Sequence, residues 1–248
     1  MATPPGDGAP LTPSDPPGAE LHPDLARLLR ARPSRLSRGI SVASNPLLSI
    51  AGVTMYVGVA GTGSPWQGVA WAGVAALFCV VVPYLVLFVL IGRGIVADRH
   101  VVRREQRLWP HVAALASVLI ALAVLHLAGA PESLIVLVTA LLANLLVLSA
   151  VNRWSKASMH VAGFVAAATT VALHRGGWPL PWEPPQTPVD AGWIGAAGAD
   201  PRWWAVAAVC TALVGWARVR GGRHSLPQVL LGGTIGFLTS LAVFGVLA

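Results

Sequence analysis

The sequence predicts an all-α protein, a bundle of about six to seven transmembrane helices behind a disordered N-terminal tail. Composition is the first observation behind this prediction, because 55% of the 248 residues are hydrophobic and 11% are charged, whereas soluble domains carry about 25% charged residues. The second is a series of apolar runs. Each is roughly 20 residues long, which is about the length that a helix needs to cross the hydrocarbon core of a membrane. The third is that these runs are continuous rather than alternating, which excludes a barrel of strands.

The predicted tail covers residues 1–40. Its first 23 residues are rich in Pro, Gly, Ala and Asp, and they are expected to be disordered because they have little apolar surface to bury. Residues 25–36 combine Leu with Arg and predict a short amphipathic helix on the membrane surface. The remainder, 41–248, is expected to form one transmembrane domain.

Seven apolar runs give the spans in chain order. They cover about residues 44–63, 67–92, 109–128, 134–151, 158–174, 203–217 and 228–247. Short hydrophilic or turn-forming segments separate them, except for a longer loop at 175–202 that is rich in Trp and Pro. Aromatic residues of this kind gather at the membrane interface.

Basic residues lie almost entirely on one side of the predicted bundle. If every run crosses the membrane, the tail and the loops 93–107, 152–156 and 218–223 share a face that carries 15 of the 17 Lys and Arg residues. Loops rich in Lys and Arg remain in the cytoplasm. This distribution predicts a cytoplasmic N-terminus and an integral protein of a prokaryotic plasma membrane.

Several functional classes fit the composition poorly. The net charge of +7 lies in short loops beside apolar runs, whereas binding to nucleic acid needs a soluble basic face. Cys79 and Cys210 lie inside apolar runs, form no Cys-x-x-Cys pattern and are interpreted as small packing residues. The sequence indicates neither a disulfide framework nor a metal site.

Three polar segments on the basic face could carry chemistry. In the first, 98–107, Arg103 and Arg107 are four residues apart and share one face if the segment is helical. The second, 156–160, opens a span, and the N-terminus of a helix attracts anions. The third, 218–224, precedes the last span. Lys156 is the only lysine in the chain. A basic segment such as 93–107 could also serve as a plain anchor to anionic lipid.

These segments resemble the three motifs of the type 2 phosphatidic acid phosphatase superfamily, which are K-x6-R-P, P-S-G-H and S-R-x5-H-x3-D. The second motif corresponds to residues 157–160, Ala-Ser-Met-His, and the third to Ala217-Arg218, five residues, His224, three residues and Gln228. The first is looser, with Arg107 in the arginine place, Leu instead of Pro after it, and His100 where the family has Lys. The resemblance covers about residues 98–236, and the small residues at 232–236 are similar to the closely packed start of the family's last helix.

The resemblance implies a phosphatase that acts on a lipid or prenyl phosphate or diphosphate. His224 would form a phosphohistidine, and His160 would protonate the leaving oxygen and then activate water. Basic residues would neutralise the negative charge on the phosphoryl oxygens, and Ser158 would donate a further hydrogen bond. The basic residues are Arg107, Lys156 and Arg218, with Arg103 or Arg104 in place of the missing lysine. The resemblance implies no cofactor and no metal.

Gln228 departs from the family, because an aspartate there orients the nucleophilic histidine and stabilises its positive charge. A Gln side chain accepts a hydrogen bond but brings no charge, and a comparable Asp-to-Asn change in serine proteases costs about ten-thousandfold in rate. Asp98 is one of two acids on the basic face outside the tail, and we hypothesise that it replaces the missing carboxylate.

The sequence is also compatible with two other functions. The departures at Gln228, at Ala217 and in the first motif favour a catalytically weak relative that binds phosphorylated lipid or scaffolds a membrane partner. A small transporter or structural membrane protein would use the basic clusters as topology signals alone. The phosphatase hypothesis requires Lys156, His160, Arg218 and His224 to converge on one spot the size of a phosphate.

Overall fold

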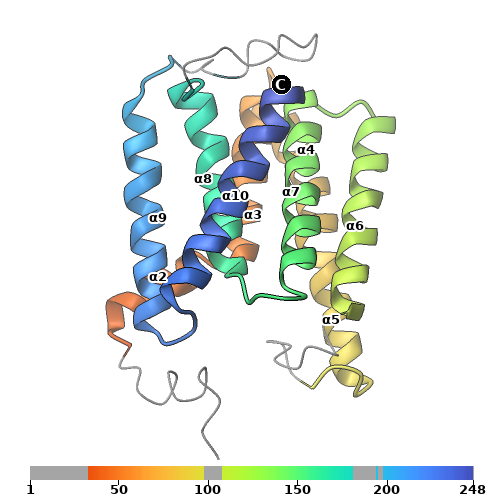
Figure 1. Cartoon of the computed structure of the whole chain (residues 1–248). Coiled ribbons are helices and arrows are strands. Elements are labelled where there is room, and N and C mark those ends of the chain that lie inside the picture. The colour runs from red at the N-terminus through yellow and green to blue at the C-terminus, as the bar shows by residue number, and fades with distance from the viewer. Residues whose placement is uncertain (1–32, 98–107, 181–193, 195–197, 248) are drawn as a thin grey trace, which may run out of the picture.

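The computed structural model describes residues 33–97, 108–180, 194 and 198–247 (Figure 1). In this part of the chain all regular secondary structure is helical, which confirms the predicted class. The helices are α2 (Arg35–Ala43), α3 (Pro46–Ala60), α4 (Pro65–Ala76), a π-helical turn (Leu77–Val81), α5 (Val82–Gly92), α6 (Leu108–Leu127), α7 (Glu132–Val151), α8 (Met159–Gly176), α9 (Arg202–Arg220) and α10 (Leu226–Leu247).

Four segments among the described residues are long and apolar enough to cross a membrane. They are Pro65–Gly92, Leu108–Leu127, Glu132–Val151 and Leu226–Leu247, and α2 with α3 makes a fifth if the pair, bent by 49°, counts as one span. These segments match predicted spans, but they are fewer than the six to seven expected. Helices α8 and α9 occupy the other two predicted positions and run alongside the rest of the bundle (Figure 1).

Helix α2 is amphipathic and begins at Arg35, so residues 35–40 of the predicted disordered tail are helical. Most of the amphipathic helix predicted at 25–36 falls outside the described residues, because the structure describes this range only from residue 33 on. Ser34 determines the start, because its Oγ accepts a hydrogen bond from the Ser37 backbone N–H at 3.1 Å, and an N-cap of this kind satisfies a helix donor. Exposed Leu36 and Val42 flank the buried Ser37.

Gly222 controls the reversal between α9 and α10. Its φ of +67° lies in the left-handed region, which glycine enters without the steric penalty of a Cβ. The Arg223 N–H donates to the Arg218 carbonyl at 3.2 Å, and the Gly222 N–H donates to the Val219 carbonyl at 3.0 Å. These two bonds form a Schellman motif, which turns the chain sharply and brings His224 back toward α10.

Helices α8 and α10 cross in close contact. A Cβ added to Gly232 would lie 2.5 Å from the Ser158 carbonyl oxygen, and one added to Gly236 would meet the backbone of Ala162. Small residues allow helix backbones to approach in this way. The close packing expected for residues 232–236 is therefore confirmed. It fixes the start of α8 against the first turns of α10.

The interior of the bundle is built around α7. Leu134, Leu137 and Val138 of this helix are almost fully buried, and they belong to a core that includes Val57 of α3 and Phe244 of α10. By contrast, α5 has no buried residue, and its apolar side chains face the surroundings. An apolar exterior around an apolar interior is the pattern of a helix bundle in a lipid solvent.

Candidate functional site

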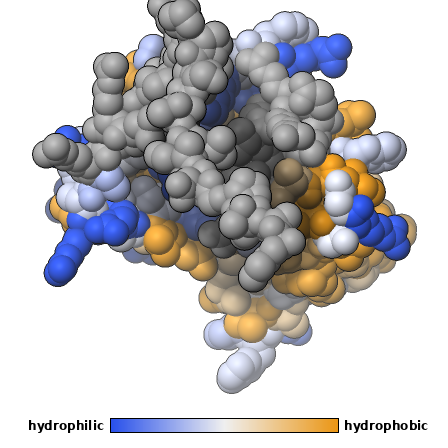
Figure 2. Space-filling view, turned by 90° about the horizontal axis from the view of Figure 1, so that it is seen from below, coloured by the Kyte–Doolittle hydropathy of each residue, from blue (hydrophilic) through white to orange (hydrophobic). Residues whose placement is uncertain are grey.

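The candidate site lies at the end of the bundle where α2, the α7–α8 loop and the α9–α10 loop meet (Figure 1). Hydrophilic residues lie on this end beside apolar flanks (Figure 2). Among the described residues, both acidic side chains, Glu132 and Asp200, are at the opposite end. The described basic residues at the site end are Arg35, Arg38, Arg93, Arg153, Lys156, Arg218, Arg220 and Arg223. This charge distribution suits an anionic ligand.

The α7–α8 loop is held by two hydrogen bonds at its far end. Asn152 Oδ1 accepts from the Ala157 N–H at 2.9 Å, and the Ser158 N–H donates to the Gln228 carbonyl at 3.0 Å. The second bond ties the start of α8 to the start of α10. Asn152 was not among the residues singled out in the sequence. Its signal was its place directly after an apolar span, where Asn often caps a helix end.

Ser158 is the residue that precedes α8, and it is completely buried. Its Oγ neither caps the helix nor bonds any other described group. A buried hydroxyl without a partner costs free energy, and here it adjoins a helix start, which attracts anions. His160 lies in the first turn of α8, and Lys156 lies two residues before Ser158. Both side chains are partly buried.

Arg218 is a buried cation in the last turn of α9. Its side chain is 9% exposed, and its Nε has no partner among the described residues. The Arg223 cation lies nearby. A guanidinium keeps its charge at neutral pH, and here its burial has a desolvation cost that a bound anion would offset.

Arg218 lies on the face of α9 that packs toward α8 and α10. Val214, four residues earlier on the same face of α9, packs into a buried cluster with Val161, Val165 and Val229, which we call the valine cluster. The cluster joins α8, α9 and α10 just inside Ser158 and Gln228. One turn further out, the same face of α9 carries the guanidinium over this junction.

Gln228 contacts both His224 and the start of α10. Its Oε1 lies 3.3 Å from His224 Nδ1 and accepts from the Ser225 N–H at 3.1 Å. Ser225 and Gln228 are three residues apart at the helix start, which is the spacing of a capping box. The glutamine therefore has a structural task as well as a position suited to orienting the histidine. The capping task was missed, although Ser-x-x-Gln is visible in the sequence.

Hydrogen bonds link Ser158, Gln228 and His224, and packing of the valine cluster brings the Arg218 face of α9 to the same junction. Lys156 and His160 flank Ser158 on the same chain segment. The first-motif residues Arg103, Arg104 and Arg107, and also Asp98, lie outside the described residues. Within the described part no group of three His, Cys, Asp or Glu side chains could hold a metal ion.

Comparisons with protein-family models, with curated proteins and with solved structures find no match to this chain. The chemistry of the site is therefore argued from its own residues. Among the described residues, a buried guanidinium, a hydroxyl without a partner and a helix start lie at one junction with no carboxylate beside them. All three are hydrogen-bond donors, and donors grouped in this way bind tetrahedral oxyanions such as phosphate. Two histidines next to such donors could exchange protons or attack phosphorus.

Proposed function

We propose that this chain is a membrane phosphatase of the type 2 phosphatidic acid phosphatase superfamily, which hydrolyses a lipid or prenyl phosphate or diphosphate. The observation that carries the proposal is Arg218, a buried cation whose Nε has no partner among the described residues and whose helix face lies over the junction of α8 and α10. In a purely structural protein the desolvation free energy of this cation would stay uncompensated, whereas in a phosphate-binding site the bound anion offsets it.

The first chemical step would transfer the phosphoryl group to His224. The Nδ1–H of His224 donates to Gln228 Oε1, so that Nε2 carries the lone pair that attacks phosphorus. As the N–P bond forms, the P–O bond to the lipid breaks, and His160 gives its proton to the leaving oxygen. Arg218 and the donors at the start of α8 would stabilise the charge on the phosphoryl oxygens, with Lys156 beside them.

The second step would release inorganic phosphate. His160, now neutral, takes a proton from a water molecule whose oxygen attacks phosphorus. The P–N bond breaks, the electron pair returns to Nε2 of His224, and the lipid alcohol and phosphate leave. Each histidine ends the cycle in its starting protonation state, and this chemistry calls for no metal ion.

A second candidate is a catalytically weak relative that binds phosphorylated lipid. One observation favours it, namely that Gln228 Oε1 accepts from Ser225 N–H at 3.1 Å, closer than its 3.3 Å approach to His224. In this alternative the residue is kept for the helix start, and the aspartate of the family has been lost together with turnover. The donors around Arg218 would still bind the phosphate group.

The membrane arrangement is part of the proposal. We place α8 and α9 across the bilayer beside the four or five candidate spans, which gives six to seven crossings and a cytoplasmic N-terminus in a prokaryotic plasma membrane. The basic side chains at the site end support this orientation. The phosphorylated head group would meet the cytoplasmic end of the bundle, and its apolar chain would lie among the helices.

Phosphate release by the purified protein tests the function. The panel contains phosphatidic acid, phosphatidylglycerol phosphate, and short prenyl phosphates and diphosphates, without added metal. Release that disappears in a His224→Ala variant of unchanged thermal stability is the expected result. Binding of these lipids by a folded protein that releases no phosphate would favour the weak relative, and neither binding nor release would contradict both candidates.

A further inference from the structure

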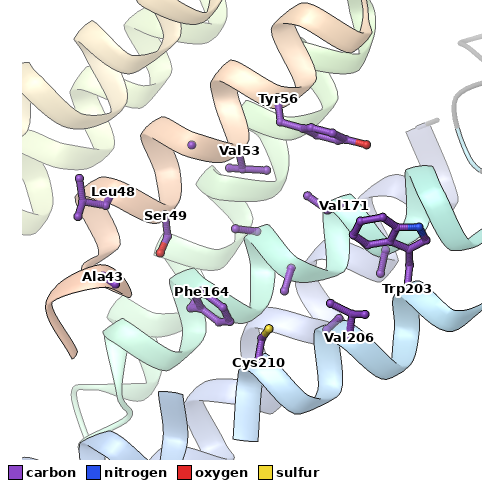
Figure 3. Close-up of a pocket in the computed structure, with 15 residues that line it drawn as sticks. Ala43, Leu48, Ser49, Val53, Tyr56, Phe164, Val171, Trp203, Val206 and Cys210 are labelled. Carbon is purple, nitrogen blue, oxygen red and sulfur yellow. The ribbon is translucent and has the colours of Figure 1, made fainter. Parts of the chain in front are cut away.

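A cavity of about 330 Å³ lies between α3, α8 and α9 (Figure 3). Helices α3 and α9 each pack against α8, but among the described residues they make little or no contact with each other. Helix α8 therefore forms the floor of a groove whose walls are α3 and α9. Leu48 on one wall and Val206 on the other are 56% and 49% exposed, so the groove opens on the side of the bundle that faces the bilayer.

The lining of the groove is apolar and mostly small. Gly52, Ala168 and Ala207 leave space where larger side chains would let the helices fill the gap, and Phe164 and Cys210 point into it (Figure 3). Pockets for small ligands begin at about 300 Å³, so the volume suits one narrow ligand. The lining extends from Ala43 to Tyr56 along α2 and α3, about 20 Å at the rise of a helix. A hydrocarbon chain is long and thin in this way.

The two ends of the groove differ. At one end the Tyr56 hydroxyl is engaged by His174 Nδ1 at 2.6 Å, and Trp203, with Arg175 5.0 Å from its ring, lies beside them. At the other end the lining reaches Ala43, the last residue of α2. Ile40, one turn earlier on α2, packs on the valine cluster beneath Arg218. Along α8 and α9 the lining ends at Phe164 and Cys210, about two helical turns from Ser158 and Arg218, and the valine cluster lies between the groove and the junction.

We infer that the groove holds one linear hydrocarbon chain of an anionic lipid whose phosphate lies at the junction of Ser158, Arg218 and His224. This inference rests on the proposed function for the position of the head group. The charge at the junction selects a phosphorylated head, and the single narrow groove selects one extended chain, as in a prenyl or other single-chain phosphate. Any second chain remains in the bilayer.

Photo-crosslinking tests the groove without requiring turnover. The full-length protein in phosphatidylcholine nanodiscs is exposed to tetradecyl phosphate that carries a diazirine near the end of its chain, and to the matching alcohol. We expect the phosphate to label residues of α3 and α9 that line the groove. An Ala207→Phe variant should reduce this labelling about tenfold, whereas Ala208→Phe, the same change on the adjacent exposed residue, should leave it unchanged.

Three results would overturn the inference: equal labelling by the alcohol, no effect of Ala207→Phe, or cross-links between two copies at the groove in place of lipid labelling. Phosphate release measured on the same samples separates the two proposals. Groove labelling without release refutes the phosphatase and leaves chain binding intact, whereas release without groove labelling does the reverse.

Discussion

At the residue scale, Arg218 has an energetic cost that the proposed phosphate site would explain. Its charge is buried, its Nε has no partner in the part of the chain that the structure describes, and Arg223 repels it. Replacement by Met, which has a similar length and no charge, should raise the free energy of unfolding by about 1 kcal/mol, because the desolvation cost of the cation disappears. Phosphate release should fall about 100- to 1,000-fold, as when a donor to a transition state is removed.

Thermal unfolding in detergent and a phosphate-release assay measure the two effects of Arg218→Met. Arg220→Met is the matched control, because Arg220 lies in the same helix turn but is exposed, and both quantities should stay close to those of the native protein. A loss of stability with Arg218→Met would show that the guanidinium is a structural partner of another group, contrary to the proposal.

Substitution of Gln228 tests whether a carboxylate at this position would speed the attack of His224 on phosphorus. Glutamate keeps the length of the side chain and is equally suited to the capping box, so Gln228→Glu should fold normally. Its charge would stabilise the imidazolium of His224, and phosphate release should rise about tenfold or more, in the direction opposite to the loss seen on removing such a charge.

The control for Gln228→Glu is Gln228→Ala, which removes the bond to the Ser225 N–H and should lower the free energy of unfolding by about 1 kcal/mol. Rates are compared from pH 6 to 8, where a glutamate at a helix start is ionised. Unchanged turnover with Gln228→Glu would assign Gln228 to the helix cap alone.

Single residues could be predicted from the sequence where a motif fixed their spacing. Ser158, Arg218, His224 and Gln228 were proposed from such spacing, and the structure brings them to one junction. Asn152 was missed because its side chain closes a loop by accepting a hydrogen bond from the Ala157 N–H, and no short sequence pattern predicts such a loop closure. The burial of Arg218 was also unforeseen, because it depends on three helices that meet there.

At the element scale, the apolar runs in the sequence predicted where each helix lies along the chain, but they did not predict which helices pack against each other. Helices α3 to α10 lie close to the predicted ranges, because an apolar run of this length in lipid satisfies its backbone only as a helix. Helix α2 overlaps the end of the predicted tail, where no span was expected, and the Ser34 cap decides its start.

The contact between α8 and α10 makes a prediction about two adjacent glycines. A Cβ at Gly232 would lie 2.5 Å from the Ser158 carbonyl oxygen, whereas one at Gly233 would lie 3.6 Å from a Val161 methyl group. Gly232→Ala should therefore push the helices apart, weaken the bond between the Ser158 N–H and Gln228, and cost about 1–3 kcal/mol. Gly233→Ala should be neutral or slightly stabilising, because alanine favours the helix.

Thermal unfolding and phosphate release of the two alanine variants measure this difference. Equal stability of both would contradict the close crossing of α8 and α10. Retained release in a destabilised Gly232→Ala protein would show that the position of Ser158 is not critical to the site.

At the scale of the whole molecule, apolar side chains cover the sides of the bundle, and charged side chains gather at its ends. The sides of the bundle are apolar, its two ends are polar, and the described basic side chains gather at the end that holds the candidate site. One distribution can serve two purposes, since loops rich in Arg and Lys remain in the cytoplasm and the same residues attract anionic head groups. Topology measurements separate the two explanations.

Single cysteines at three positions give this measurement, after Cys79 and Cys210 are changed to Ala. We expect Arg202→Cys to react with a membrane-impermeant maleimide on intact cells, because Arg202 is 86% exposed at the end opposite the site. Arg153→Cys and Arg220→Cys should react after the membrane is permeabilised. If Arg202→Cys also requires permeabilisation, α8 and α9 enter and leave on one side and do not cross. If Arg153→Cys and Arg220→Cys react on intact cells, the basic end faces outward, and its charge is there for the phosphate rather than for topology.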